Sequence, residues 1–427
     1  MPQVEGGLRP EQCLGSRTFA GIGVAVTTAP FSRVDTDDLA SCVACGLCLP
    51  HCPTYRTTGS DAHSPRGRIA LIAGVRDGSL DLDEGVKEAI DTCVQCMGCL
   101  PACPSGVRYD RIIAPAVEEL TARRASSRIR RSLTLSPLGR PRLLRLLTFI
   151  AILAQRLHVL PRRLGLPRLS FSRAHASRRI EGTGERVVIF SGCVMDAWYG
   201  DVHRDTHDVL TAMGFDTRFS DPALCCGALH SHAGLSARAA GLEERIMASL
   251  SGATVVVNSA GCGAHLRASF GDVAGQPTKV VDVMEFIDSN IERLSAVCPP
   301  LPERAREPVV VHDACHLRNL QGVHLAAHRV LARYHRVIPI PDEGLCCGAG
   351  GAFAIEHPDV AREIVERKYV AIETVVDPEA SYISSGNPGC IGHLTANKPR
   401  SLSRMSVVHP VQVVARMLAN VRIETEK

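Results

Sequence analysis

The chain has 427 residues, enough for two or three domains, and its 45% share of hydrophobic residues argues against a disordered protein. Its net charge is only +4, and its few aromatic side chains exclude the stacking platforms with which many proteins bind single-stranded nucleic acid. The 18 cysteines would suggest disulfide bonds in a secreted protein, but residues 1–30 lack the basic segment and long apolar core of a signal peptide. We therefore expect a reducing compartment, in which clustered cysteines indicate metal or redox chemistry.

The first part of the chain is expected to be a mobile lead of residues 1–33, because it is rich in glycine and shows no periodic pattern. A helix is predicted from about Thr36, with Thr36 and Asp37 as its cap. This helix leads into the first of two cysteine loops.

The two loops, residues 42–53 and 93–104, have the same spacing, C-x2-C-x2-C-x3-C-P. Bacterial ferredoxins bind two [4Fe-4S] clusters with this spacing, and the fourth cysteine of each loop binds the cluster of the other loop. The predicted ligand sets are Cys42, Cys45, Cys48 and Cys103 for one cluster, and Cys93, Cys96, Cys99 and Cys52 for the second. Structural zinc and a disulfide framework are weaker alternatives, because a zinc site needs four ligands and not eight in a doubled pattern.

Helices are expected on either side of these loops. Ser64 and Pro65 predict a helix start, a further helix is predicted over residues 83–92, and another is expected to end near Arg124. Residues 34–124 are therefore predicted to form an all-α, ferredoxin-like domain. Two arginines next to the first loop, Arg66 and Arg68, either compensate the negative charge of the clusters or lie at an exposed helix end.

An arginine-rich helical bridge is expected over residues 125–183. Residues 121–180 contain fifteen arginines and no lysine, aspartate or glutamate, so the rest of the chain carries the difference between +4 and +15, which is −11. The longest uncharged run in this segment is too short to cross a bilayer. It could pack on its own domain as a linker helix, or contact an anionic membrane surface or a partner through residues 121–180; nucleic acid is a weaker interpretation, and none is expected as a partner.

From Arg186 onward, short β-branched runs alternate with longer helical stretches, which predicts an α/β fold. This region repeats itself, with a strand-end cysteine, a Cys-Cys-Gly turn and a Gly-Cys turn in each half at offsets of 122, 121 and 128 residues. We therefore predict a duplicated α/β domain, with residues 184–300 as the first repeat and residues 301–427 as the second.

Each repeat offers four thiols in loops that should converge at one edge of a parallel sheet. The candidate metal ligands are Cys193, Cys225, Cys226 and Cys262 in the first repeat, and Cys315, Cys346, Cys347 and Cys390 in the second. An iron-sulfur centre, structural zinc and a redox-active thiol site all remain open at this point. His265 and His393, three residues after the last cysteine of each set, are either ligands, donors to a ligand or ordinary hydrogen-bonded histidines.

Organic cofactors and catalytic acids or bases are not predicted from this sequence. Residues 348–353 are glycine-rich but lack the third glycine of G-x-G-x-x-G, so we interpret them as a tight turn beside Cys347. Cys298 is expected in a linker between the repeats, without a role. No catalytic residue is assigned, and the chain is expected to relay electrons while another subunit performs the hydride chemistry.

These motifs, with their flanks in residues 52–55, 65–68, 103–107, 312–315 and 345–350, resemble the iron-sulfur subunits of glycolate oxidase. The resemblance implies a duplicated CCG domain after the ferredoxin-like domain, flavin-containing partner subunits that oxidise glycolate to glyoxylate, and a membrane quinone as acceptor. It also implies a cytoplasmic protein, peripheral on the inner face of the cell membrane, with no substrate site on this chain alone. In related CCG domains, the cysteine set that binds a noncubane cluster ends in C-x2-C, whereas His265 and His393 stand at its last position here.

Four alternatives to this function remain open. Related iron-sulfur subunits serve D-lactate or glycerol-3-phosphate dehydrogenases, or heterodisulfide reductases. A metal-stabilised scaffold without a redox role belongs to a different class of function.

Overall fold

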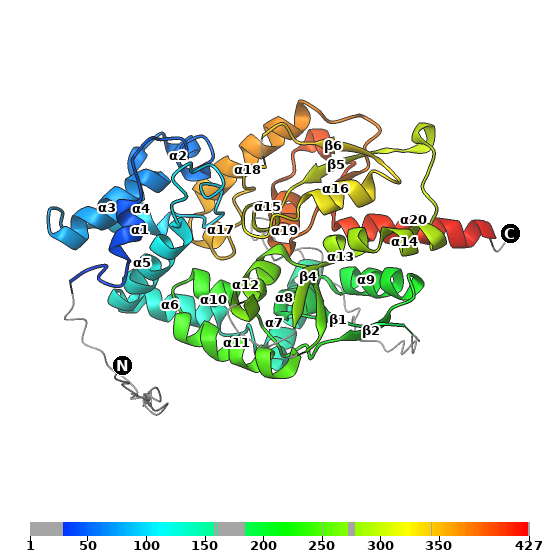
Figure 1. The fold of residues 1–427 in the computed structure, drawn as a ribbon, viewed down its shortest axis with the longest axis horizontal. Helices are drawn as coiled ribbons and strands as arrows, with labels where there is room; N and C mark the ends of the chain where they lie inside the picture. The colour runs from blue at the N-terminus through cyan, green and yellow to red at the C-terminus, as the bar shows by residue number, and fades with distance from the viewer. Residues whose placement is uncertain are drawn as a thin grey trace, which may run out of the picture.

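The computed structural model describes residues 29–157, 159, 184–250, 252–271, 278–342 and 344–425 (Figure 1). The expected mobile lead before residue 29, and most of residues 158–183 of the arginine-rich bridge, lie outside this range. Within it, the fold is mixed α/β, with a helical N-terminal part followed by two parallel sheets.

Helices and loops make up the described residues before the first sheet. The elements are α1 (Thr36–Ala40), α2 (Pro53–Thr58), the short 3-10 helix η1 (Asp61–His63), α3 (Pro65–Asp77), α4 (Glu84–Asp91), α5 (Tyr109–Arg123), α6 (Ala125–Leu135) and α7 (Pro141–Arg156). Ser64 caps α3 by accepting a hydrogen bond from the Gly67 amide, and Pro65 is its first residue, as predicted.

The predicted cap of α1 was wrong by one residue. Asp35 caps this helix, because its backbone is extended and its carboxylate accepts hydrogen bonds from the amides of Asp37 and Asp38. Thr36 already has its place in the first turn, so its side chain does not serve as the cap.

The remaining elements form two repeats with one topology. The first contains β1 (Arg186–Phe190), α8 (Cys193–Trp198), α9 (Gly200–Ala212), β2 (Asp216–Phe219), α10 (Ala228–His232), α11 (Ser236–Leu250), β3 (Thr254–Val257), α12 (Ala260–Gly271), β4 (Lys279–Asp282), α13 (Val283–Ser289) and α14 (Ile291–Val297). The second contains η3 (Glu303–Ala305), β5 (Pro308–His312), α15 (Cys315–Asn319), α16 (Leu325–Leu331), β6 (Arg336–Pro339), α17 (Phe353–Glu356), α18 (Pro358–Glu373), β7 (Tyr382–Ser385), α19 (Pro388–Asn397), η4 (Arg400–Leu402), β8 (Ser406–Val408) and α20 (Pro410–Thr425).

Both sheets are parallel and four-stranded, and their strands follow the same order, β2-β1-β3-β4 and β6-β5-β7-β8. The central strands β1 and β5 are rich in valine and buried, as expected for parallel strands that are covered on both faces. The repeats also share a hydrophobic core, which includes Val187 of β1 and Val309 of β5. Helix α20 of the second repeat crosses back to pack on α9 of the first (Figure 1).

The arginine-rich bridge packs on the first repeat. Leu135, Leu138 and Leu144, from α6, α7 and the turn between them, are buried in a cluster with Cys225 and Ala233. In the part of the chain that the structure describes, no helix combines the length and the apolar character needed to cross a membrane.

Candidate metal centres

The two ferredoxin-type loops have the same backbone conformation. Ala44 and Gln95, each directly before the second cysteine of its loop, have left-handed backbones with φ of 54° and 55°. Gly46 and Met97 occupy the next equivalent position, with φ of 83° and 58°. Because left-handed residues let successive amides turn toward one concavity, each loop can surround an anionic group.

The first loop encloses a cavity with the predicted membership. Cys42, Cys45, Cys48 and Cys103 line it, together with Cys99 at its inner side. Cys45 is exposed, and its neighbours Val43 and Leu47 are 69% and 56% exposed. Arg66 closes the rim, where its Nη1 donates to the carbonyl oxygen of Ala44 at 3.0 Å.

A second cavity lies deeper in the protein. It is lined by Cys52, Cys93, Cys96 and Cys99, so the last cysteine of the first loop faces the second set, as the spacing predicts. Arg68 is fully buried beside it, where its Nε donates to the Ala89 carbonyl and its Nη2 donates to the Thr54 hydroxyl at 3.1 Å. Arg66 and Arg68 were predicted either to compensate the charge of the clusters or to lie at an exposed helix end. The buried position of Arg68 beside this cavity favours charge compensation.

The chemistry of this donor set fits an iron-sulfur cofactor. Burial raises the pKa of the thiols of Cys93 and Cys99, so their thiolates need a compensating cation, and metal binding would release protons. The thiols of each set surround a small cavity, as a multi-atom cluster requires. The assignment of individual ligands stays a prediction.

All eight cysteines of the two repeats line one further cavity, of about 520 Å³. They lie where the carboxyl ends of β1 to β3 and β5 to β7 meet, the usual place for a site in a parallel α/β sheet. In the first repeat, the sulfur of Cys193 lies 3.4 Å from that of Cys225, and the sulfurs of Cys226 and Cys262 are 3.2 Å apart. Hydrogen bonding to Cys225 and burial raise the pKa of Cys193 well above its usual value.

The ferredoxin-type part and the second repeat meet at their thiols. The Cys96 side chain contacts that of Cys346, and this hydrogen bond together with burial raises the pKa of Cys96. Nearby, the Nδ2 of Asn319 donates to the carbonyl of Cys96 at 2.9 Å, and a ring nitrogen of His316 lies 3.0 Å from the carbonyl oxygen of Gln95. The inner ferredoxin-type cavity and the thiols of the repeats are therefore contiguous.

The histidines at this junction differ from those that the sequence suggested. His265 bonds to Glu243 at 2.7 Å, and His393 lies 3.2 Å from the Ala361 carbonyl oxygen, so both have ordinary partners. Instead, His232 and His316 line the cavity of the repeats, with their ring centroids 5.4 Å apart. No spacing motif marks these two residues, because α10 and α15 come together only when the repeats pack.

The glycine-rich residues 348–353 form a turn and the start of α17, with left-handed backbones at Gly348, Gly350 and Gly351. A Cβ atom on Gly348 would lie only 2.9 Å from the Ala361 carbonyl oxygen, so this position requires glycine. Cys298 is fully buried at the end of α14, away from the other thiols, and its carbonyl accepts a hydrogen bond from Tyr334.

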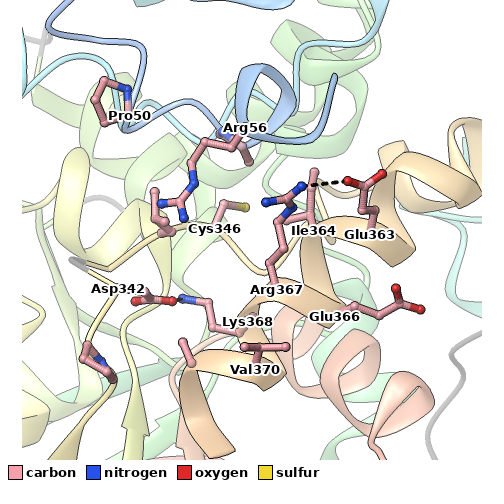
Figure 2. A pocket seen from close by; sticks show the side chains of 14 residues that line it. Pro50, Arg56, Asp342, Cys346, Glu363, Ile364, Glu366, Arg367, Lys368 and Val370 are labelled. Carbon is pink, nitrogen blue, oxygen red and sulfur yellow. Dashed lines mark hydrogen bonds and ion pairs between the residues drawn. The ribbon is translucent and has the colours of Figure 1, made fainter. Parts of the chain in front are cut away.

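A further pocket of about 710 Å³, lined by charged and apolar side chains, also reaches Cys346 (Figure 2). It lies between α2, which supplies Arg56, and α18, which supplies Arg367. Arg367 pairs with Glu363, and the buried Lys368 pairs with Asp342 (Figure 2). Because acids and bases are mixed in its lining, the pocket forms a polar seam between the two parts and has no unbalanced charge to select an ion.

Comparisons with known proteins match the parts of the chain that carry these cysteines. Residues 38–107 match the family described as 4Fe-4S dicluster domain, and residues 187–267 and 309–395 match the family described as cysteine-rich domain. The probable glycolate oxidase iron-sulfur subunit of Bacillus subtilis is 29% identical over 84% of this chain and 89% of its own length. The glycolate oxidase iron-sulfur subunit of Escherichia coli is 29% identical over 89% of this chain and 94% of its own.

A more distant relative, lactate utilization protein A of Geobacillus thermodenitrificans, is 25% identical and aligns with 54% of this chain and 98% of its own. The domain matches and the coverage of the glycolate oxidase subunits together give the classification. This chain is an iron-sulfur protein with a 4Fe-4S dicluster domain and two cysteine-rich domains, and it is similar over most of its length to glycolate oxidase iron-sulfur subunits.

Proposed function

We propose that this chain is the electron-transfer subunit of a complex that oxidises glycolate to glyoxylate, and that it passes the electrons toward a membrane quinone. The observation that carries the proposal is the contact between Cys96 and Cys346, which makes the ferredoxin-type thiols continuous with those of the repeats. A scaffold without redox function would have no need of this continuity.

Within this proposal, the chain binds two [4Fe-4S] clusters through the eight cysteines of its ferredoxin-type loops. The outer cluster is held by Cys42, Cys45, Cys48 and Cys103, and the inner one by Cys93, Cys96, Cys99 and Cys52. The eight cysteines of the repeats hold a further iron-sulfur or metal centre. The chain is divided into five parts: a lead of residues 1–33, an all-α domain of residues 34–124, a bridge of residues 125–183, and two repeats of residues 184–300 and 301–427.

Electrons enter at the outer loop. Cys45, Val43 and Leu47 are exposed there, whereas the inner loop is covered by the second repeat. A flavin-containing subunit would dock on this apolar rim and reduce the outer cluster first. No step of substrate chemistry is assigned to this chain, and its place is at the inner face of the cell membrane.

Copurification and spectroscopy test the proposal. The affinity-tagged chain, purified anaerobically, should retain a flavoprotein, and glycolate should reduce its clusters as followed by EPR. A chain without a flavoprotein partner, or with zinc in place of iron and acid-labile sulfide, contradicts it. D-Lactate, glycerol 3-phosphate and a disulfide serve as alternative substrates, of which lactate has the support of the similarity to lactate utilization proteins.

The Cys96→Ser variant tests the inner ligand set directly. It should lose about half of the iron of the ferredoxin-type part and destabilise its loop, because cluster binding contributes folding energy. Cys298→Ser is the matched control, since Cys298 is also buried but lies away from the other thiols. Full iron content and full electron transfer in Cys96→Ser would show that the ligand set is wrong.

A further inference from the structure

The cavity of the repeats has two kinds of wall. The eight thiols line part of it, and an apolar part includes Leu144, Leu147 and Ala151 of α7. The two parts meet where Leu144 packs in one cluster with Cys225 and Cys193. Two of the lining side chains, Leu147 and Ile355, are 42% and 66% exposed. The cavity therefore opens to the surface along apolar side chains.

Helix α7 separates this cavity from the surface and is apolar on both sides. Its outer face exposes Leu146, Ile150 and Leu153, each at least 50% exposed. Helix α6 continues the apolar surface with Ile129 and Leu133, at 59% and 68%. Apolar side chains thus occupy two faces of α7, one along the cavity and one at the surface, and an exposed apolar face of this kind marks a surface for interaction.

The charge around this face specifies the partner. Arg142 and Arg145 of α7 are exposed beside the apolar side chains, and so is Arg130 of α6, which also lies 3.8 Å from Glu356. Residues 121–180 contain no acidic residue. Exposed leucine and isoleucine with arginines at the border are complementary to the anionic surface of a phospholipid bilayer.

From these observations we propose that the part of the cavity along α7 binds the ring of a quinone, while the thiols hold the metal centre in the remaining part. The quinone enters past Leu147 and Ile355 from an anionic bilayer beneath α6 and α7. This inference rests on the proposed function, because the quinone is the electron acceptor in that function and the inference locates its binding site. The quinone takes up two electrons, which arrive one at a time through the thiol-bound centres, and two protons from water, and leaves as the quinol. The two electrons are those released when glycolate becomes glyoxylate.

Polar groups for a quinone carbonyl are present on the outer wall. The hydroxyl oxygen of Thr148 accepts a hydrogen bond from the Trp198 indole at 3.2 Å and retains its own hydrogen for donation to a ligand. Both residues line the cavity. Replacement of Thr148 by valine keeps the shape and removes this donor, and should weaken quinone binding about threefold to tenfold.

Trp198 makes binding measurable without turnover, because it is the only tryptophan of the chain and lines the cavity. The purified, cluster-containing full chain is titrated with a short-tailed benzoquinone in detergent, and quenching of its tryptophan fluorescence should saturate. Ala151→Phe fills the cavity from α7 and should weaken binding at least about tenfold. Quenching that does not saturate, or affinities unchanged in both Ala151→Phe and Thr148→Val, would overturn the proposal.

A matched variant on the other side of the same helix tests the bilayer. Ile150→Glu should leave quinone quenching in detergent unchanged but abolish binding to vesicles that contain phosphatidylglycerol, and the parent chain should bind these better than pure phosphatidylcholine and less well at high salt. Vesicle binding that persists in Ile150→Glu rejects this part. Glycolate-dependent reduction of a water-soluble dye by the whole, unsubstituted complex distinguishes a failure of the proposed function from a failure of this inference. If glycolate does not reduce the dye, the proposed function is refuted. If the dye is reduced normally but no quinone binds, only this inference is refuted.

Discussion

Arg68 is the residue through which the protein most directly affects the inner set of thiols. Its side chain is fully buried in α3 and holds the Ala89 carbonyl and the Thr54 hydroxyl, while its Nη1 points toward the sulfur of Cys52 at 4.0 Å. Burial by itself would lower the pKa of Arg68, but the neighbouring thiol of Cys93 raises it, so the guanidinium stays charged. A fixed positive charge next to a cluster stabilises the reduced, more negative state.

The Arg68→Gln variant should therefore lower the reduction potential of the inner cluster. A shift of roughly 60 mV corresponds to about 1.4 kcal/mol for one electron, which is a modest value for a buried charge at this position. Redox titration followed by EPR measures the shift, with Arg66→Gln at the exposed rim as the control. A stability loss without any change in potential would mean that Arg68 only supports the fold.

At the scale of single elements, helix α13 carries a buried acid at its start. Asp282 ends β4, caps α13 by accepting from the Met284 amide, and forms a capping box with Glu285. Arg267 pairs with Glu285 close by. Burial raises the pKa of Asp282 to about 7, although the hydrogen bond from Met284 opposes this shift.

A raised pKa means that the folded chain holds this proton more tightly than the unfolded chain. The contribution of Asp282 to stability is therefore complete below pH 4 and is lost as the pH rises through 7. Asp282→Asn keeps a capping side chain and removes the charge, so it should stabilise the first repeat at pH 8 by at most about 4 kcal/mol and have little effect at pH 4.

Urea unfolding at the two pH values measures this difference. Asp282→Ala is the control, because it removes the cap together with the charge and should be about 1 kcal/mol less stable than Asp282→Asn at both pH values. A gain of equal size at pH 4 and pH 8 would contradict the explanation by charge burial.

Elements and repeats were the part of this molecule that the sequence predicted well. Ser64 and Asp83 start helices α3 and α4 as expected, because a cap depends on residues within one turn. The duplicated cysteine pattern corresponds to two sheets with the same strand order. The cap of α1 was placed one residue late, since two successive polar residues, Asp35 and Thr36, can both fill that role in sequence.

Contacts between the domains were not predictable in this way. Cys346 and Cys96 are far apart in the chain, and neither His316 nor His232 belongs to a spacing motif. Their proximity depends on how the ferredoxin-type part packs against the repeats. For the same reason, helices could be predicted for the described part of the arginine-rich bridge, which contains α6 and α7, while the buried position of one of its arginines could not be foreseen.

At the scale of the whole molecule, that arginine joins the parts. Arg131 of α6 has a side chain only 7% exposed, and its Nε and Nη2 donate to both oxygens of Glu356 in α17, at 3.0 and 2.9 Å. Its Nη1 donates to the Thr121 hydroxyl at 2.7 Å, and its Nη2 lies 3.5 Å from an oxygen of Asp91 in α4. One guanidinium thus links the ferredoxin-type part, the bridge and the second repeat.

Removal of one partner from this network should cost more than removal of both. Arg131→Met leaves the half-buried Glu356 with Arg130 alone, at 3.8 Å, while Asp91 keeps its 3.1 Å contact with Arg124. It should therefore destabilise the docked arrangement by about 1 to 3 kcal/mol, whereas Arg131→Met combined with Glu356→Gln should recover part of that loss. Hydrogen exchange of the α4 and α17 amides measures the docking free energy, while the amides of β1 and β5, which lie in the repeats' own sheets, should keep their protection. If the two substitutions are additive, or if β1 and β5 lose protection equally, Arg131 contributes to general stability and does not hold the relay together. Loosened docking would also separate Cys96 from Cys346, so the same variant should slow electron transfer from the ferredoxin-type part to the repeats without any loss of iron.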